Sequence, residues 1–520
     1  MKIGLINLGC PKNQVDSEIM LGMLKDAGFE LTFNEEEAEI VVVNTCGFID
    51  AAKEESINTM LHLAKLKKVG KCRLLVAAGC LPQRYKDELL KEMPEIDAVV
   101  GTGSFHEVVT ICKEFMKRKV TPQWSVGGAI APERLTESSW APVKARKRRA
   151  VLALSEAKKA SPLEAGRLPR LRDLDRSTAK ARSEGATAPP VREALQQIYI
   201  TDPANFSYER PLPRIRISPA HTAFVKIAEG CDHTCTFCII PVLRGKQRSR
   251  TIDSIAGEVE RLSMEGVVEI NLVAQDSTAY GRDLREPNAL ARLLQRLVTI
   301  RDIQWIRLLY TYPGSFIKDL IDVMAGEEKI CNYIDMPVQH INDDILRGMH
   351  RGHTRKSIYR TIETLRKKIP DVILRTSLIV GFPGETEKQF NELIKFVEEV
   401  AFDRLGVFTY SNEEGTEAYS LPDQTKEKEM EKRRDILMKT QQKISLRKNQ
   451  RLIGSKQIVL IDGPSQDAPY LLEGRTYGHA PEVDGVVYIA DMAGSIPTLG
   501  EFVSVEITEA HPYDLIGKLM

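Results

Sequence analysis

Three cysteines stand close together in the sequence, at Cys231, Cys235 and Cys238, with the spacing C-x3-C-x2-C. They directly follow an apolar, strand-like run at residues 224–228. Three thiolates on one short loop can hold three irons of a four-iron, four-sulfur cluster, whereas closed electron carriers use four cysteines. The fourth iron then has no protein ligand and can chelate a small molecule. The spacing therefore predicts a catalytic cluster.

Two other interpretations of this loop stay open. A structural zinc site needs four ligands, usually in two separated C-x2-C pairs. No fourth cysteine lies within reach in the sequence, although His233 could serve as a ligand. The cysteines could also be ordinary buried thiols.

Three further cysteines, Cys10, Cys46 and Cys80, each follow a short apolar run in the first 118 residues. The expected strands are residues 3–8, 40–44, 74–78 and 98–100, with helices at about 16–27, 50–66, 83–91 and 104–117. Ligands of open α/β sheets bind at the carboxyl ends of strands, so these cysteines should meet on one rim as a second three-thiolate site. The alternative is three unrelated core cysteines. Cys72, Cys112 and Cys331 are interpreted as packing residues.

The central part of the chain repeats the βα pattern six times. The expected strands are residues 224–228, 268–273, 304–309, 332–336, 372–379 and 405–409. This predicts a partial, six-stranded parallel barrel with its chemistry at the carboxyl ends of the strands. The motifs expected there are the Cys231 loop, Gln275-Asp276, residues 310–314, Gln339-His340 and residues 381–385.

The predicted fold class is therefore α/β, in four segments. Residues 1–118 form an N-terminal parallel α/β domain, 206–448 the barrel domain, ending in a charged helix at 424–448, and 449–520 a small β-barrel. Residues 119–205 interrupt this plan. Between residues 141 and 182, thirteen Lys/Arg face four Asp/Glu, and residues 141–198 contain no aromatic side chain. That composition predicts a basic, flexible insertion, although the run 144–149 could also contact nucleic acid.

Bulk properties narrow the function class. The formal net charge of the whole chain is +1, so the part outside the insertion is net negative. Nine cysteines, an odd number at uneven spacings, are not a disulfide framework. The first residues resemble a strand more than a signal peptide, and no apolar run reaches the roughly 18 residues of a membrane helix. These features predict a cytoplasmic protein.

The motifs taken together resemble the radical S-adenosylmethionine (SAM) methylthiotransferases, over about residues 1–118 and 206–520. The Cys231 loop has the cysteine spacing of the radical-SAM enzymes, and the last 70 residues resemble the TRAM β-barrel. Within the family, the chain is most similar to the RimO branch, which modifies a ribosomal protein. The diagnostic stretches are residues 8–13 (LGCPKN), 15–18 (VDSE), 337–340 (PVQH), 480–485 (APEVDG) and 511–515 (HPYDL). A family member would usually have only a short connector at 121–200.

The resemblance implies the cofactors and their ligands. Cys231, Cys235 and Cys238 would bind the 4Fe-4S cluster that cleaves SAM to a deoxyadenosyl radical, and Cys10, Cys46 and Cys80 an auxiliary 4Fe-4S cluster that carries sulfur. Gly381, Gly384, Glu385 and Gln275 would line the SAM pocket. No side chain is expected as a catalytic acid or base, because the cofactors carry the chemistry. The implied substrate is the β-carbon of an aspartate in ribosomal protein twelve of the small subunit, possibly within the ribosome. The sequence identifies neither the electron donor nor the sulfur donor.

Two rival functions remain at this point. One is a tRNA methylthiotransferase of the MiaB branch, with the same chemistry on a nucleic acid. The other is a non-enzymatic iron–sulfur or RNA-binding protein. A net negative body suits a basic ribosomal protein better than a polyanion. We expect acidic residues of the β-barrel to attract the Lys and Arg side chains of such a protein. These residues are Glu473, Glu482, Asp484, Glu501, Glu506, Glu509 and Asp514.

Overall fold

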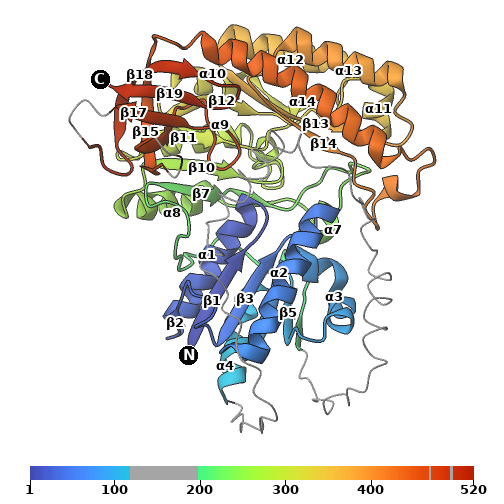
Figure 1. Ribbon diagram of the computed structural model, residues 1–520, viewed down its shortest axis with the longest axis vertical. Helices are drawn as coiled ribbons and strands as arrows, with labels where there is room; N and C mark the ends of the chain where they lie inside the picture. Colours follow the sequence, from blue (N-terminus) through green and yellow to red (C-terminus); the bar gives the residue numbers. More distant parts are fainter. Residues whose placement is uncertain (118–196, 466, 468–469, 492–495) are drawn as a thin grey trace. The chain divides into compact units, whose positions relative to one another are not determined.

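The computed structural model describes residues 1–117, 197–465, 467, 470–491 and 496–520. Its first sheet is wholly parallel, with the strand order β2-β1-β3-β4-β5-β6 (Figure 1). The strands are β1 (Lys2–Asn7), β2 (Glu30–Leu31), β3 (Ile40–Thr45), β4 (Leu74–Gly79), β5 (Ala98–Val100) and β6 (Gln197–Tyr199). Every residue of β3 and β4 is buried, as expected of the central strands of a parallel sheet covered on both faces.

Helices follow the first strands and position the loops between them. They are α1 (Pro11–Asp26), α2 (Asp50–Val69), α3 (Cys80–Glu92) and α4 (Val108–Lys117), the last preceded by a 3-10 turn, Phe105–Glu107. Pro11 is the first residue of α1, where its missing N–H costs no helical hydrogen bond. The predicted α/β domain is confirmed, and two of its helices, α1 and α3, begin closer to the preceding strands than the sequence pattern indicated.

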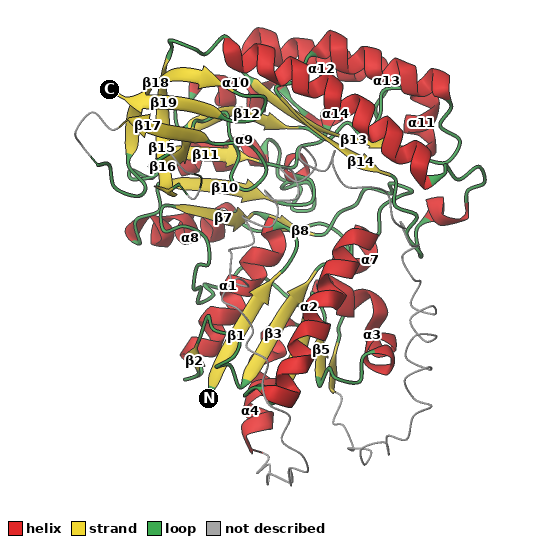
Figure 2. Cartoon of the chain, viewed as in Figure 1, coloured by secondary structure: helices red, strands yellow, loops and turns green. Residues whose placement is uncertain are grey.

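The second sheet is the partial barrel predicted from the sequence. Its six parallel strands lie side by side in chain order, β7-β10-β11-β12-β13-β14, and the sheet stays open between β7 and β14 (Figure 2). The strands are β7 (Thr222–Lys226), β10 (Glu269–Val273), β11 (Trp305–Leu308), β12 (Ile330–Asp335), β13 (Ile373–Val380) and β14 (Arg404–Thr409). A two-stranded ribbon, β8 (Ala228–Glu229) with β9 (Arg248–Ser249), follows β7.

Amphipathic helices cover this sheet and close its largest apolar core. They are α8 (Ile252–Met264), α9 (Ala289–Val298), α10 (Lys318–Gly326), α11 (Asp343–Gly348), α12 (Arg355–Lys368), α13 (Glu387–Val400) and α14 (Glu427–Gln450), and the short α7 (Ile240–Arg244) follows the cysteine loop. Helices α12 and α13 both begin with a capping box, from Thr354 with Ser357 and from Thr386 with Gln389. The expected helix at 424–448 is α14.

The C-terminal segment is a closed five-stranded barrel in the order β15-β16-β17-β19-β18. Its strands are β15 (Lys456–Pro464), β16 (Leu472–Arg475), β17 (Val487–Asp491), β18 (Phe502–Ala510) and β19 (Leu515–Leu519). The sequence pattern predicts strands at residues 457–461, 470–473, 486–488 and 502–508, and four of the observed strands fall there. The fifth, β19, was missed, and it closes the barrel by pairing with both β17 and β18.

A buried ion-pair network attaches the small barrel to the second sheet. Glu269 of β10 accepts hydrogen bonds from Arg475 of β16 (3.0 and 2.8 Å) and from Arg307 of β11 (3.1 Å). Arg475 also pairs with Asp462 of β15 (2.7 Å), which in turn contacts His221 (2.8 Å). Glu269 and Arg307 are completely buried, so neither charge is left without a partner of opposite sign.

One boundary differs from the sequence prediction. The sequence predicts that the insertion ends at residue 205. In the structure, Gln197–Tyr199 form β6 and pair in parallel with β5 of the first sheet. The prediction of a flexible, basic segment at 119–196 lies outside the described residues. In the part of the chain that the structure describes, no helix is long and apolar enough to cross a bilayer.

Candidate metal centres

Cys10, Cys46 and Cys80 stand at the carboxyl ends of three neighbouring parallel strands. Cys10 caps the start of α1 after β1, Cys46 follows β3, and Cys80 opens α3 directly after β4. These strands are adjacent in the order β1-β3-β4. The topology therefore brings the three cysteine loops to one rim, as the sequence spacing predicted.

Glycines let these loops approach each other closely. A Cβ atom at Gly9 would lie 2.9 Å from the Cβ of Cys46, and one at Gly47 would lie 3.0 Å from the backbone of Cys80. Contacts this short are not tolerated by real side chains, so a larger residue at either position would push the loops apart.

One side chain, Asn13, links all three loops. Its amide nitrogen donates to the Leu8 carbonyl oxygen (3.1 Å), which precedes Cys10, and to the Thr45 carbonyl oxygen (2.9 Å), which precedes Cys46. Its amide oxygen accepts from the Cys80 thiol (3.8 Å). Asn13 is only 1% exposed, so this arrangement is part of the core and not a surface contact.

The three thiols have different electrostatic surroundings. Burial, and then the neighbouring sulfurs of Cys80 and Cys10, raise the pKa of Cys46 to about 12. Burial also raises the pKa of Cys80. For Cys10 burial acts in the same sense, but Lys12 and Arg244 outweigh it and lower its pKa. A metal that binds thiolates must therefore displace protons from at least two of these groups.

The second set, Cys231, Cys235 and Cys238, lines one cavity at the mouth of the partial barrel. Asp232, His233, Thr234, Thr236, Pro241, Lys246 and Glu417 complete its lining. Burial raises the pKa of Cys231 to about 11 and that of Cys238 to about 12. The cavity is open to solvent on one side, as a site for a cofactor and a substrate requires.

The loops after β10 and β11 hold this cysteine loop in place. His233 shares a hydrogen bond with Asp276 (2.7 Å) and stacks on Tyr312, with ring centroids 4.1 Å apart. The guanidinium of Arg351 lies over the same tyrosine ring at 4.2 Å and donates to Cys235 Sγ (3.6 Å). The predicted motifs after strands two and three therefore contact the cysteine loop directly.

A buried polar network joins the two cysteine sets. Lys226 of β7 donates to Asp16 of α1 and to Glu229 of β8, both at 2.6 Å. Arg244 pairs with the same two carboxylates at 3.2 and 3.0 Å. The Tyr208 hydroxyl donates to Asp16 (2.7 Å). Two cations thus balance two carboxylates in a region closed to water.

The four residues expected to line the SAM pocket are placed differently from one another. Gln275 donates to Glu229 (2.8 Å) and so belongs to the buried network. Glu385 accepts from the Gly381 backbone N–H and pairs with Arg433 (3.2 Å), with its side chain completely buried. A Cβ atom at Gly384 would meet nothing within 4 Å, so the backbone there is open to a ligand. None of the four lines the cavity of Cys231, and their contact with SAM stays a prediction.

Several buried polar atoms around the mouth of the barrel have no hydrogen-bond partner. Among the described residues they include Gln275 Oε1, His340 Nε2, Arg351 Nε, Glu385 Oε1 and both ring nitrogens of His353. Burial, and then the nearby Arg351, lower the pKa of His353 to about 4, so this imidazole is neutral. Buried polar groups normally find partners, and such a concentration fits a site for a polar ligand.

The geometry argues against a preformed zinc site. Nowhere in the described ranges do three His, Cys, Asp or Glu side chains come close enough to hold a single metal ion. In a four-iron cluster each cysteine binds a different iron, so the three sulfur atoms need not converge on one point. The donor set, three thiols and no fourth ligand, fits such a cluster at both sites.

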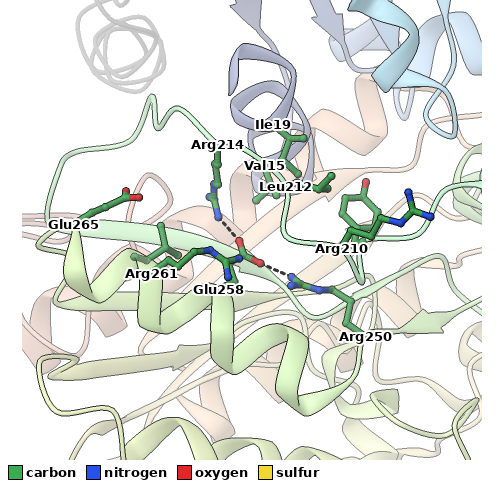
Figure 3. Close-up of a pocket in the computed structure, with 11 residues that line it drawn as sticks. Val15, Ile19, Arg210, Leu212, Arg214, Arg250, Glu258, Arg261 and Glu265 are labelled. Carbon is green, nitrogen blue, oxygen red and sulfur yellow. Dashed lines mark hydrogen bonds and ion pairs between the residues drawn. The ribbon is translucent and has the colours of Figure 1, made fainter. Parts of the chain in front are cut away.

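A second cavity lies away from both cysteine sets, between α1 and α8 (Figure 3). Glu258 stands at its centre and is bridged by Arg214 (2.7 Å) and Arg250 (2.5 Å). Arg214 also pairs with Glu18 of α1 (2.5 Å). Each of these charged groups has a partner of opposite sign. We therefore interpret the cavity as part of the packing contact between α1 and the second sheet.

The acidic residues of the small barrel do not form one exposed surface. Asp484 is 3% exposed; it accepts from the Tyr333 hydroxyl (2.7 Å) and lies 3.7 Å from Arg375. Asp514 accepts from the Val486 backbone N–H (2.9 Å). Glu482 and Glu509 are exposed. The expectation of seven available carboxylates is therefore wrong for Asp484.

Sequence patterns did not reveal Asn13, Lys226 or Arg244 as site residues. Two of them carried a usable signal. Lys226 interrupts the apolar run 224–228, and Arg244 ends the apolar run 239–243. A charge inside an apolar segment is rarely buried without a partner, so both positions could have been singled out as members of a buried network.

Three family models match successive parts of the chain, and named relatives align with all of it. Residues 2–101 match the uncharacterised protein family UPF0004, residues 225–397 the radical SAM superfamily and residues 453–520 the TRAM domain. A protein of Koribacter versatilis, named ribosomal protein uS12 methylthiotransferase RimO, is 42% identical over 100% of this chain and 96% of its own length. One of the same name from Geobacter sulfurreducens is 42% identical over 100% and 98%. The solved structure of the radical SAM methyltransferase TsrM from Kitasatospora setae is 15% identical, with a TM-score of 0.47, and covers 78% of this chain and 72% of its own.

Proposed function

The chain belongs to the RimO family of radical-SAM methylthiotransferases, and from this premise we propose that it adds a methylthio group to the β-carbon of an aspartate in ribosomal protein uS12. Relatives of that name align with the whole chain. One observation carries the reaction class. Two sets of three cysteines, each one ligand short of a closed cluster, stand at the carboxyl ends of two parallel sheets that one buried network joins.

The cysteines divide the cofactors between them. In this proposal Cys231, Cys235 and Cys238 hold the cluster that binds SAM, and Cys10, Cys46 and Cys80 hold the auxiliary cluster. When bound, these groups supply reductive cleavage of SAM and a sulfur that is methylated and transferred.

The protein's own groups position these sites. Arg351 donates to Cys235, and the Tyr312–His233 stack fixes the loop of that set. Gln275, Gly381, Gly384 and Glu385 are proposed to border SAM, with the open backbone at Gly384 as the surface of approach.

The buried side chain of Lys12 supports a substrate that carries a carboxylate. Lys12 is 93% buried, yet within the described residues no carboxylate lies within ion-pair distance of its ammonium. Its Nζ lies 3.3 Å from the centroid of the Tyr310 ring and donates one long hydrogen bond, 3.5 Å, to the Ala274 carbonyl oxygen. A buried cation that lowers the pKa of the Cys10 thiol, and that has no carboxylate partner among the described residues, suits the carboxylate of a substrate aspartate better than a neutral base.

The rival functions make different demands. A tRNA methylthiotransferase would place an adenine beside the auxiliary cluster, where Lys12 offers no matching group. A protein without enzymatic activity would have no use for an iron that lacks a protein ligand at either set of cysteines. All nine cysteines are free thiols, which supports our placement of the protein in the reducing cytoplasm.

The test is anaerobic reconstitution followed by mass spectrometry. The loaded protein should carry about eight irons, four from each cluster. With SAM, sulfide and a reductant, it should add about 46 Da, the replacement of H by SCH3, to ribosomal protein uS12. Bulk tRNA in the same reaction should stay unchanged. Methylthiolated tRNA with unmodified uS12 would overturn the substrate and leave the reaction class, whereas the absence of SAM cleavage would overturn the class itself.

A further inference from the structure

The short helix α7 (Figure 2) follows the Cys231 loop in the chain. It begins two residues after Cys238 and ends at Arg244. Ile239 and Leu243 pack against Cys80 of the other set. A single stretch of seven residues therefore connects a cysteine of the barrel loop with a cysteine of the first sheet.

The guanidinium of Arg244 completes this connection. One of its nitrogens, Nη2, donates to Cys80 Sγ (3.7 Å) and to the amide oxygen of Asn13. Asn13 in turn holds the loops that carry Cys10 and Cys46, as described above. Arg244 thus reaches all three cysteines of the first set, one directly and two through Asn13.

Charge balance alone does not explain this geometry. The other nitrogen, Nη1, faces the carboxylates of Asp16 and Glu229, which Lys226 also pairs. A lysine at position 244 could neutralise those carboxylates equally well. Only the planar fork of arginine can bond to carboxylates through one nitrogen and to a sulfur and an amide through the other.

We propose that Arg244 is a positioning residue for the auxiliary cluster, which it holds from the barrel domain through Cys80 and Asn13. The inference rests on the proposed function, because it requires that Cys10, Cys46 and Cys80 bind that cluster. An N–H group directed at a ligating sulfur stabilises the reduced, more negative state and raises the reduction potential. Arg244 also ties the location of the auxiliary site to the loop that ends at Cys238.

The experiment isolates one cluster in the full-length chain. With Cys231, Cys235 and Cys238 replaced by Ala, only the auxiliary cluster remains, so its spectrum and midpoint potential can be measured without overlap. In this background Arg244→Lys is compared with Arg214→Lys. Arg214 is also a buried arginine that links α1 to the barrel domain, through Glu18 and Glu258, and no hydrogen bond joins it to a cysteine in the part of the chain that the structure describes.

Arg244→Lys should lower the midpoint potential of the auxiliary cluster, alter its electron paramagnetic resonance spectrum and increase iron loss to a chelator by roughly 10- to 100-fold, the usual cost of losing an outer partner of a metal ligand. Arg214→Lys should leave potential and spectrum unchanged. Equal behaviour of the two variants would overturn the proposal and make Arg244 a plain ion-pair residue. If the background protein itself binds no four-iron cluster, the assignment of the auxiliary site has failed instead.

A second variant covers the case in which Arg244→Lys does not fold. Asn13→Ala removes the acceptor of the Arg244 fork and leaves the pairs with Asp16 and Glu229 in place. It should release auxiliary iron to the chelator faster while the wild-type SAM cluster, tested with its cysteines intact, keeps its four irons and its SAM cleavage. Auxiliary iron held as firmly as in the parent protein would contradict the proposal.

Discussion

Lys12 lowers the pKa of Cys10, so a role in substrate binding has to be distinguished from a role in cluster binding. If its ammonium binds the substrate carboxylate, Lys12→Met should leave iron content and SAM cleavage unchanged and raise KM for uS12 by roughly 10- to 100-fold, since a charge-assisted hydrogen bond contributes about 1.5–3 kcal/mol. Steady-state kinetics with purified uS12 measures the effect.

Two comparisons sharpen this prediction. Lys12→Arg keeps the charge and should restore much of the affinity, and uS12 with Asn in place of its target aspartate should be insensitive to the Lys12→Met change. Loss of auxiliary iron from Lys12→Met would show that the ammonium serves the cluster and not the substrate.

Single residues also mark the limit of what the sequence could predict at the site. All six cysteines were predicted as cluster ligands from spacing and from their position after apolar runs, because βα topology fixes where the end of a strand lies. Asn13 and Arg244 were not predicted as site residues, because these two hydrogen-bonded residues lie 231 positions apart in the chain. Such a pair follows from the packing of α1 against β7, which no local pattern encodes.

At the scale of elements, α1 packs closely against the segment before β7. We therefore expect Gly→Ala substitutions in α1 and in α8 to change stability in opposite directions. Glycine inside a helix normally costs about 0.5–1 kcal/mol relative to alanine. In α8, a Cβ at Gly257 would meet only the end of the Arg261 side chain at 3.7 Å. In α1, a Cβ at Gly22 would lie 2.4 Å from the backbone of Pro213.

Gly257→Ala should therefore stabilise the cluster-free protein by about 0.5–1 kcal/mol. Gly22→Ala should destabilise it by about 1–3 kcal/mol despite the same gain in helix propensity, because backbone cannot move aside as a flexible side chain can. Urea unfolding of both variants beside the parent protein gives the comparison. A stabilising Gly22→Ala would mean that α1 does not pack against residues 213–214 in solution.

Element type was easier to predict than element number. All six strands of the partial barrel were expected, because βα repeats leave a regular apolar pattern. Five of the described strands were missed. Three of them, β2, β8 and β9, have only two residues each, and β6 and β19 were missed for different reasons. β6 has only three residues and follows a long atypical segment, whereas β19 contains Gly517, whose hydrogen leaves room for Val505 in the barrel core. Gly lowers strand propensity, so the pattern there was weak.

At the scale of the whole molecule, the network around Glu269 makes attachment of the small barrel sensitive to acid. Burial alone would raise the pKa of Glu269, but Arg475 and Arg307 lower it to about 2 from the usual 4.5. A carboxylate with a depressed folded-state pKa contributes stability that is fully present above pH 4.5 and is lost as pH falls towards 2. The contribution amounts to about 3 kcal/mol.

The comparison of wild type with Glu269→Gln tests this dependence. The gap in apparent unfolding free energy between the two cluster-free proteins should narrow by about 3 kcal/mol between neutral pH and pH 2. Other carboxylates titrate equally in both proteins, so they cancel. A gap that stays constant with pH would show that Glu269 does not hold its charge through Arg475 and Arg307.

The pairing of β5 with β6 also bears on the order of events during synthesis. The first sheet is complete only when residues 197–199 reach the edge of β5, almost one hundred residues after that strand has left the ribosome. At about 5–20 residues per second, the delay is roughly 5–20 s. During that time β5 is an unpaired edge, the kind of surface at which nascent chains associate wrongly. Cys10, Cys46 and Cys80 all precede this gap, so the three ligands proposed for the auxiliary cluster emerge while the first sheet is still unfinished.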